Sequence, residues 1–203
     1  MILALFVGTA AGAPVVWRAS TTVTRRIPAL PGRSLDAYFA RPETPRQILT
    51  LNPGIETAEK VEDVDARTSI WEGRTAPLQF GSGVSVTSIM RFRVTFDANE
   101  MLLEVLETST ESQGPKIFTR MIDGLLPKVS SRTSMRQSGD SVTSDAYLEL
   151  ELPLPNWLPL PRRQIEKAGP PILEKQLGDD MSALLEAYAK AYVSAAADLV
   201  VRS

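Results

Sequence analysis

Hydrophobic and polar residues alternate along most of the chain from about residue 55 to residue 155. The clearest stretch is GVSVTSIMRFRVTFD, residues 83–97, where Val86, Met90 and Phe92 share one face and arginines and threonines share the other. A period of two is typical of antiparallel strands with one buried face. The sequences GSG (81–83), DAN (97–99) and SGD (138–140) fall between such stretches, so they predict hairpin turns.

Three other segments have helical patterns. Residues 31–51, PGRSLDAYFARPETPRQILTL, predict two short helices, with Ser34 as the N-cap of the first. Residues 115–127 carry apolar residues at helical spacing and predict a short helix between two strands, either a lid over a cavity or a plug at one end of the sheet. Apolar residues spaced by three and four from Leu173 onward predict one long C-terminal helix, with Gly169-Pro170-Pro171 at its start.

The proline-rich stretch ELPLPNWLPLPRR, residues 151–163, continues the period of two. Its prolines are separated by two, four and two residues, so they do not fit the three-residue repeat of polyproline recognition motifs. Leucines continue on even positions and prolines on odd ones, which predicts an extended end to the last strand. We therefore expect this stretch to lead from the sheet to the long helix, as part of one fold.

The N-terminus predicts both a processed segment and a first strand. Residues 1–14 combine an apolar run with small residues, as in a cleaved targeting segment, and residues 15–28 alternate as a strand does. The following stretch is rich in Arg, Ser and Thr without an acidic residue, which is typical of plastid transit peptides. We expect a plastid location, with a secreted or cytoplasmic one as the alternative, and a single domain over residues 15–203.

Composition excludes several kinds of chemistry. The 203 residues include no cysteine and no histidine, so disulfides, Cys/His zinc sites and Ser-His-Asp or Cys-His mechanisms are ruled out. The formal net charge is −2, and four arginines without an acid in the first 35 residues are the only basic bias. We expect no nucleic-acid partner, no metal and no cofactor.

The predicted order is a strand, two short helices, about six further antiparallel strands and a long amphipathic helix. This is an α+β helix-grip layout, a curved antiparallel sheet of about six to seven strands wrapped around a C-terminal helix. The segments RSLDAYFARPETPRQIL (33–49) and AYLELELPLPNWLPLPRRQIEKAGPPILEKQLGDDMSALLEAYAKAY (146–192) resemble a family of cyanobacterial and plastid proteins of unknown function with a single START-like (SRPBCC) domain.

This resemblance implies a cavity between the sheet and the helix that holds an apolar molecule such as a lipid, a sterol or a pigment. We therefore expect a non-enzymatic protein that binds a hydrophobic small molecule, with a membrane surface or a plastid protein as a further partner. Met and aromatic side chains suit an adaptable apolar pocket. The candidate ligand-binding residues are Met90, Phe92, Phe96, Leu150, Met181, Leu184 and Tyr188.

Two alternative functions compete with this interpretation. A cyclase or hydrolase would need an inward carboxylate of raised pKa, for which Glu72, Glu104 and Glu107 are the nearest candidates, although each is expected to face solvent. A plastid assembly or scaffold protein would need exposed anchors, which the three tryptophans, Trp17, Trp71 and Trp157, would supply. A solid core in place of a cavity is the structural alternative to ligand binding.

Overall fold

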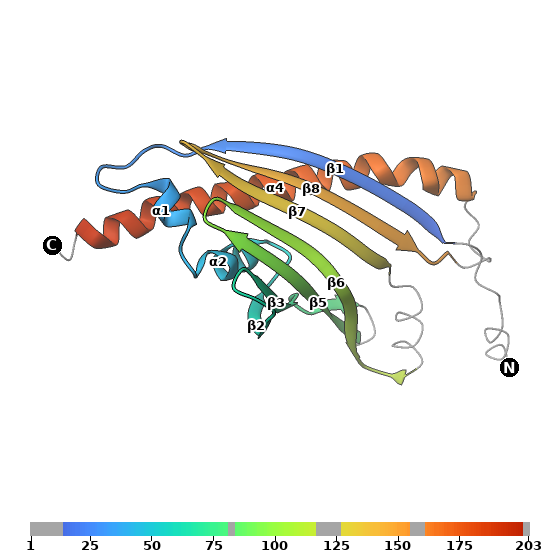
Figure 1. Ribbon diagram of the computed structural model, residues 1–203. Helices are drawn as coiled ribbons and strands as arrows, with labels where there is room; N and C mark the ends of the chain where they lie inside the picture. The colour runs from blue at the N-terminus through green and yellow to red at the C-terminus, as the bar shows by residue number, and fades with distance from the viewer. Residues whose placement is uncertain (1–13, 81–83, 117–126, 155–160, 201–203) are drawn as a thin grey trace, which may run out of the picture.

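The computed structural model describes residues 14–80, 84–116, 127–154 and 161–200. One strongly curved antiparallel sheet and one long C-terminal helix make up most of the molecule, with two short helices at one end of the sheet (Figure 1). The strands are β1 (Val15–Arg26), β2 (Thr57–Asp63), β3 (Thr68–Arg74), β4 (Leu78–Phe80), β5 (Val84–Asp97), β6 (Glu100–Gln113), β7 (Lys128–Ser138) and β8 (Ser141–Leu152). The helices are α1 (Leu35–Phe39), α2 (Thr44–Leu51) and α4 (Arg162–Val200).

The helix-grip fold expected from the sequence is confirmed. The sheet runs in the order β1-β8-β7-β6-β5-β3-β2, and β4 adds an eighth strand by pairing with β5. The eight strands are one more than the upper end of the expected count of six to seven, because β4 forms a separate short strand beside β5. Thr75 marks the break, where its backbone N–H donates to the carbonyl of Ser88 and its hydroxyl accepts from the N–H of Ser88. Pro77 then interrupts the pairing, because proline has no N–H to donate.

The hairpins and caps form where the local sequence favours them. Gly139 adopts a positive φ of 59° between β7 and β8, a conformation that suits glycine. Ser34 caps α1 by accepting a hydrogen bond from the N–H of Ala37. The turn between β5 and β6 follows Asp97, which pairs with Glu100.

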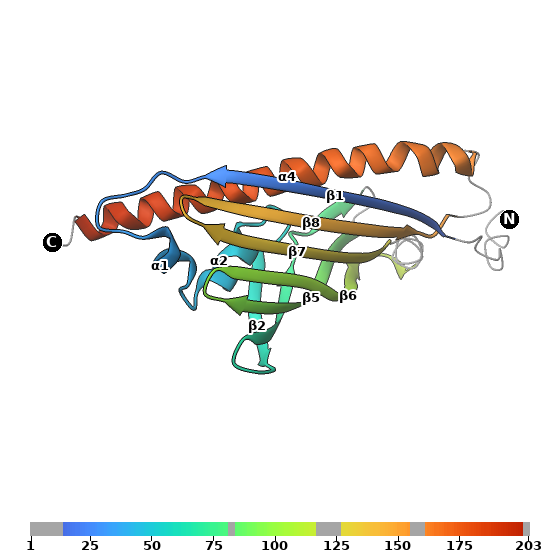
Figure 2. The ribbon, with the colours of Figure 1, turned by 45° about the horizontal axis from the view of Figure 1, so that its top comes forward.

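The long helix α4 runs beside β1 along most of that strand (Figure 2). It begins at Arg162, eight residues before the first of the two prolines, so the prediction that Gly169-Pro170-Pro171 sets its start was wrong. The first turns are held by a tertiary contact: Trp17 lies against Gly169 and its indole N–H donates to the carbonyl of Ile165 at 3.1 Å. This contact supports a helical segment that two internal prolines would otherwise disfavour.

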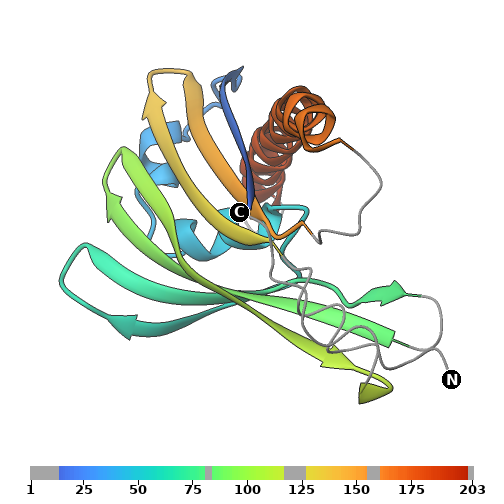
Figure 3. The same cartoon turned by 90° about the vertical axis from the view of Figure 1, so that its right-hand side faces the viewer.

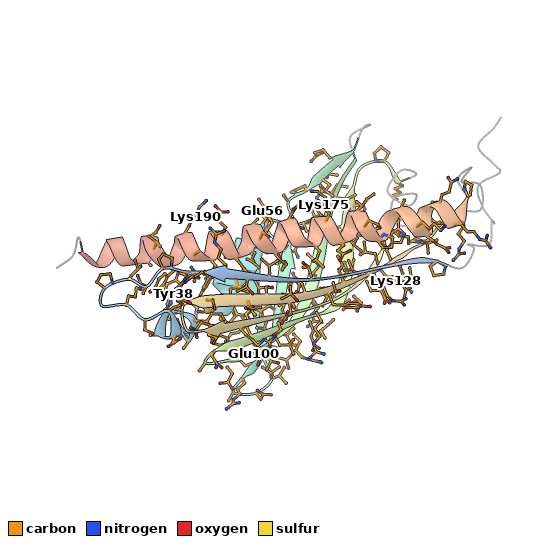
Figure 4. The ribbon with its side chains drawn as sticks, turned by 90° about the horizontal axis from the view of Figure 1, so that it is seen from above. Tyr38, Glu56, Glu100, Lys128, Lys175 and Lys190 are labelled. Atoms are coloured by element: carbon orange, nitrogen blue, oxygen red, sulfur yellow. The ribbon has the colours of Figure 1, made fainter. Side chains whose placement is uncertain are left out.

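The core is closed at the end of the sheet that carries α1 and α2. Rings of Tyr38, Phe39, Tyr188 and Tyr192 pack edge to face, with centroids 5.1–6.1 Å apart, and each is at most 2% exposed. The guanidinium of Arg41 lies 3.7 Å from the centroid of the Tyr38 ring. Figure 4 shows Tyr38 at this end, beneath the C-terminal part of α4. These side chains leave no exposed apolar surface among them.

Several predicted features fall outside the described residues. They are the targeting segment over residues 1–14 apart from Pro14, the GSG turn at 81–83, most of the short helix at 115–127, and residues 155–160 of the proline-rich stretch. Strand β8 continues into the proline-rich stretch as far as Leu152, which pairs with Val15.

Candidate functional site

The sheet divides into two branches at the end away from α1 and α2. Strands β6 and β7 pair only over five positions, from Glu100–Arg136 to Glu104–Arg132. Beyond them β6 continues with β5 as far as Gln113, while β7 continues with β8 back to Lys128. Figure 3 shows the two pairs of strands diverging. We call this part of the molecule the split end.

The register identifies which side chains face the helix at the split end. Trp17 contacts α4, so it points to the inner face of the sheet. Residues directly opposite each other in an antiparallel ladder share a face, so Leu150 and Val129, which follow Trp17 across β8 and β7, also point inward. On the other branch Val105 pairs with Phe92, a core residue that is 3% exposed.

Six apolar side chains on the inner side of the split end are only half-buried. Four of them pack against the closed core: Met90, Val105, Leu148 and Leu173. Val129 and Leu150 lie further out on β7 and β8. We call the set the inner rim: Met90 on β5, Val105 on β6, Val129 on β7, Leu148 and Leu150 on β8, and Leu173 on α4.

The contrast between the two ends follows from where the helices pack. Helix α2 packs on β2 and on the C-terminal part of α4, and α1 packs on β7, so the closed end is covered on several sides. At the split end α4 packs mainly along β1, with a smaller contact to β8. The inner faces of β5 and β6 are therefore not covered by the helix in the way that β1 is.

The sequence-predicted ligand residues are distributed over both ends. Phe92, Met181, Leu184 and Tyr188 are buried in the closed core, at most 5% exposed, and Phe96 packs on Phe39 beside them. The structure brings Met90 and Leu150 into the inner rim. Burial raises the pKa of the Tyr188 phenol.

Sequence reasoning missed four residues of the inner rim: Val105, Val129, Leu148 and Leu173. Each lies in an alternating or helical pattern, so inward orientation could be predicted for all four from periodicity. The signal that separates them from core residues is incomplete burial, which depends on the sheet dividing between β6 and β7. No local sequence pattern carries that information.

The three candidate carboxylates lie on the outer face. Glu104 is within 4 Å of both Arg93 and Arg132, and Glu72 pairs with Arg74. Glu107 is exposed and opposite Arg91. These positions agree with the expectation that all three face solvent, so none of them reaches the inner rim.

The carboxylates with clearly shifted pKa values are shifted downward. The Arg18 guanidinium lowers the pKa of Glu149 by hydrogen bonding, and the Thr22 hydroxyl and Arg136 lower the pKa of Asp145. The pKa values of Asp65 and Glu186 are lowered by hydrogen bonds from the Arg67 backbone and from Lys190. A carboxylate that acts as a general acid near neutral pH needs the opposite shift.

The outer surface carries two open depressions. One, of about 460 Å³, crosses the outer face of β1, β8, β7 and β6 and is lined by polar residues such as Arg132, Arg136 and Asp145. The other, of about 580 Å³, lies between α1 and the turns that follow β5 and β7. Both are separate from the inner rim. In the described part of the chain, no helix is long and apolar enough to cross a membrane.

Two of the three tryptophans make contacts inside the fold. Trp17 joins β1 to α4, and Trp71 is 7% exposed with its indole N–H donating to the hydroxyl of Ser69. Neither stands out as a free surface anchor. Trp157 lies outside the described residues.

Several solved structures have a similar fold at low sequence identity. A START superfamily protein from Mycobacterium smegmatis is 15% identical over 87% of this chain and 97% of its own, with a TM-score of 0.46. Ginseng major latex-like protein 151 from Panax ginseng is 10% identical over 86% and 97%, with a TM-score of 0.42. Norcoclaurine synthase from Thalictrum flavum, in complex with dopamine and hydroxybenzaldehyde, is 13% identical over 93% and 95%, with a TM-score of 0.44.

Comparisons of the sequence itself give no relative. No protein-family model and no curated protein matches the chain. The expected membership of a cyanobacterial and plastid family therefore stays a prediction.

Proposed function

We propose that this protein binds a hydrophobic small molecule, such as a lipid, a sterol or a pigment, against the inner rim at the split end. The observation that supports it is the inner rim itself, where six apolar side chains from five elements lie on the inner side of the split end and stay half-buried. Apolar surface that the fold leaves incompletely covered gains free energy from a ligand, about 25 cal/mol for each Å² removed from water. A concave apolar face with a few polar groups is the usual form of such a site.

A binding role without catalysis agrees best with the groups near the inner rim. The candidate carboxylates point to the outer face, and the sequence has neither cysteine nor histidine. A scaffold role would use exposed aromatic anchors, whereas Trp17 and Trp71 are used inside the fold. The plastid location is a proposal that comes from the N-terminal sequence alone.

Binding is tested by titration with N-phenyl-1-naphthylamine, an uncharged probe whose fluorescence rises in apolar surroundings. We expect saturable binding near one probe per chain. Solvent extraction of protein purified from its native host, followed by mass spectrometry against a mock purification, identifies the natural ligand class. Absence of saturable probe binding to the folded protein contradicts the proposal.

A matched pair of variants locates the site. Val129 and Lys128 are neighbours on β7 and point to opposite faces, because Val129 pairs with Leu150 and Lys128 with Glu151. We expect Val129→Trp to fill the space beside the inner rim and weaken probe binding about tenfold or more, and Lys128→Trp to leave it unchanged. Circular dichroism and melting temperature confirm that both variants fold. Equal binding by both folded variants places the probe elsewhere.

A further inference from the structure

An irregularity in β6 determines which side chains reach the inner face at the split end. Arg91 of β5 is opposite Glu107, but its neighbour Phe92 is opposite Val105, so Leu106 is an extra residue in β6. Strand β5 keeps an unbroken register with β3 across the same positions, which assigns the bulge to β6. Bulges of this kind re-aim the side chains that follow them.

The bulge replaces carboxylates by hydroxyls on the inner face. Before it, Met101, Leu103 and Val105 point inward on odd positions. After it, even positions point inward, because Thr108 is opposite Met90 and Thr110 is opposite Ser88. In a regular ladder that kept residue 106, Glu107 would instead lie opposite Met90 and Glu111 opposite Val86, both on the inner face.

The other strands at the split end follow the same rule. At the split end, the inward positions of the described parts of β1, β5, β6, β7 and β8 are apolar or carry a hydroxyl, and none of them is charged. They are Val15, Trp17, Ala19, Thr21, Val86, Ser88, Met90, Val105, Thr108, Thr110, Ser112, Val129, Ser131, Thr133, Ala146, Leu148, Leu150 and Leu152.

One of these hydroxyls is buried without a partner. The Oγ1 atom of Thr108 is shielded from solvent and makes no hydrogen bond in the structure. Thr108 lies opposite Met90 and follows Val105 on the inner face, so two residues of the inner rim flank it. A buried hydroxyl without a partner is unfavourable, and a ligand oxygen that pairs with it removes that cost.

We infer that the ligand is an uncharged amphiphile, an apolar molecule with a hydroxyl or carbonyl group, and that Thr108 hydrogen-bonds this polar group. This inference rests on the proposed function and names its ligand class. Carboxylates and phosphates are disfavoured, because the inward positions of the described strands at the split end carry no Lys or Arg and burying an unpaired charge is costly. A neutral oxygen needs only the single hydroxyl that the bulge supplies.

The test compares two ligands of equal chain length as competitors of bound N-phenyl-1-naphthylamine. At pH 8 we expect dodecan-1-ol to displace the probe at a concentration at least about tenfold lower than dodecanoate, since only the acid must be buried as an ion. As the pH falls below about 5 and the acid becomes protonated, the two should converge. Equal displacement at pH 8 overturns this inference and leaves the proposed function standing, whereas failure of the probe itself to bind overturns both.

Variants at Thr108 test the hydrogen bond. We expect Thr108→Val, which keeps the shape, to weaken dodecan-1-ol binding about fivefold, and Thr108→Ser to restore the affinity for the alcohol. Ser109→Ala, at the neighbouring position on the outer face, serves as the control. An unchanged affinity of Thr108→Val for the alcohol contradicts the role of this hydroxyl.

Discussion

Gly169 shows how one missing side chain positions a helix against a strand. A Cβ atom at this position would lie 1.9 Å from Cε2 of Trp17, so no other residue fits while Trp17 keeps its place. Gly178, nine residues further along the same helix, is different, because the nearest atom to a Cβ there is Oγ1 of Thr21 at 3.7 Å. The same substitution therefore has opposite consequences at the two sites.

We expect Gly169→Ala to lower the free energy of unfolding by about 1–3 kcal/mol through overpacking. Gly178→Ala should raise it by about 0.5–1 kcal/mol, because alanine is the better helix former. Urea unfolding followed by circular dichroism measures both changes. Similar effects of the two substitutions would mean that Trp17 does not lie tightly against α4.

The ion pair between Arg18 and Glu149 on the outer face allows a separate prediction. The pKa of Glu149 is lowered mainly by the hydrogen bond from Arg18, and next by that from Tyr147. Because the folded-state pKa is depressed, Glu149 adds stability above its unfolded-state pKa, and this is lost as the pH falls through the folded-state value. The contribution is small, since the pair is exposed to solvent.

Arg18→Gln should raise the pKa of Glu149 toward its ordinary value of 4.5. Titration of the side-chain carboxyl by NMR measures the change. Asp145 is the internal control, because Thr22 and Arg136 lower its pKa and Arg18 does not. A pKa of Glu149 that stays fixed in the variant would contradict the pairing with Arg18.

At the scale of elements, the bulge in β6 can be removed. Deletion of Leu106 closes the ladder with Glu107 still opposite Arg91 and Thr108 still opposite Met90. We therefore expect the inner face to keep its hydroxyls and the free energy of unfolding to change by no more than about 1 kcal/mol. Leu106→Thr keeps the backbone length and alters a side chain that is 45% exposed, so its effect should stay within about 0.5 kcal/mol. Thermal unfolding of both variants tests this, and a loss of several kcal/mol on deletion alone would contradict the assignment of Leu106 as the extra residue.

The elements differ in how far the sequence predicts them. Alternation along residues 84–97 predicts β5 because one face is consistently apolar. The bulge in β6 is hidden, since Leu102 and Leu106 place apolar residues on the outer face and blur the alternation of Met101, Leu103 and Val105. The start of α4 is missed for another reason, because the contact of Trp17 with Gly169 stabilises helix ahead of two prolines and joins residues about 150 positions apart.

The candidate site is predicted less well than the fold. Periodicity identifies inward residues such as Met90, Phe92 and Leu150, but it cannot separate residues of a filled core from those beside a partly covered face. That separation depends on where β6 and β7 stop pairing, which is a property of the twist of the whole sheet.

At the scale of the whole molecule, the two ends should differ in backbone protection. Residues 105–113 of β6 pair with β5 alone, whereas Met101–Glu104 pair with strands on both sides. We expect faster amide hydrogen exchange in 105–113, measured by mass spectrometry on peptides of the folded protein, and slower exchange there when dodecan-1-ol is bound. Uniform exchange along β6, or slowing confined to the closed end, would contradict the placement of the ligand.

The five shared rungs between β6 and β7 also define how this sheet can deform. The pairs β5–β6 and β7–β8 are joined only at these five positions, so the distance between their far ends is set by the twist of each pair. We expect a wider ligand to be accommodated by a change of twist in both pairs of strands, with the hydrogen bonds inside each pair kept. We expect the separation of the two pairs of strands to vary with the width of a bound molecule, while the closed core keeps its packing.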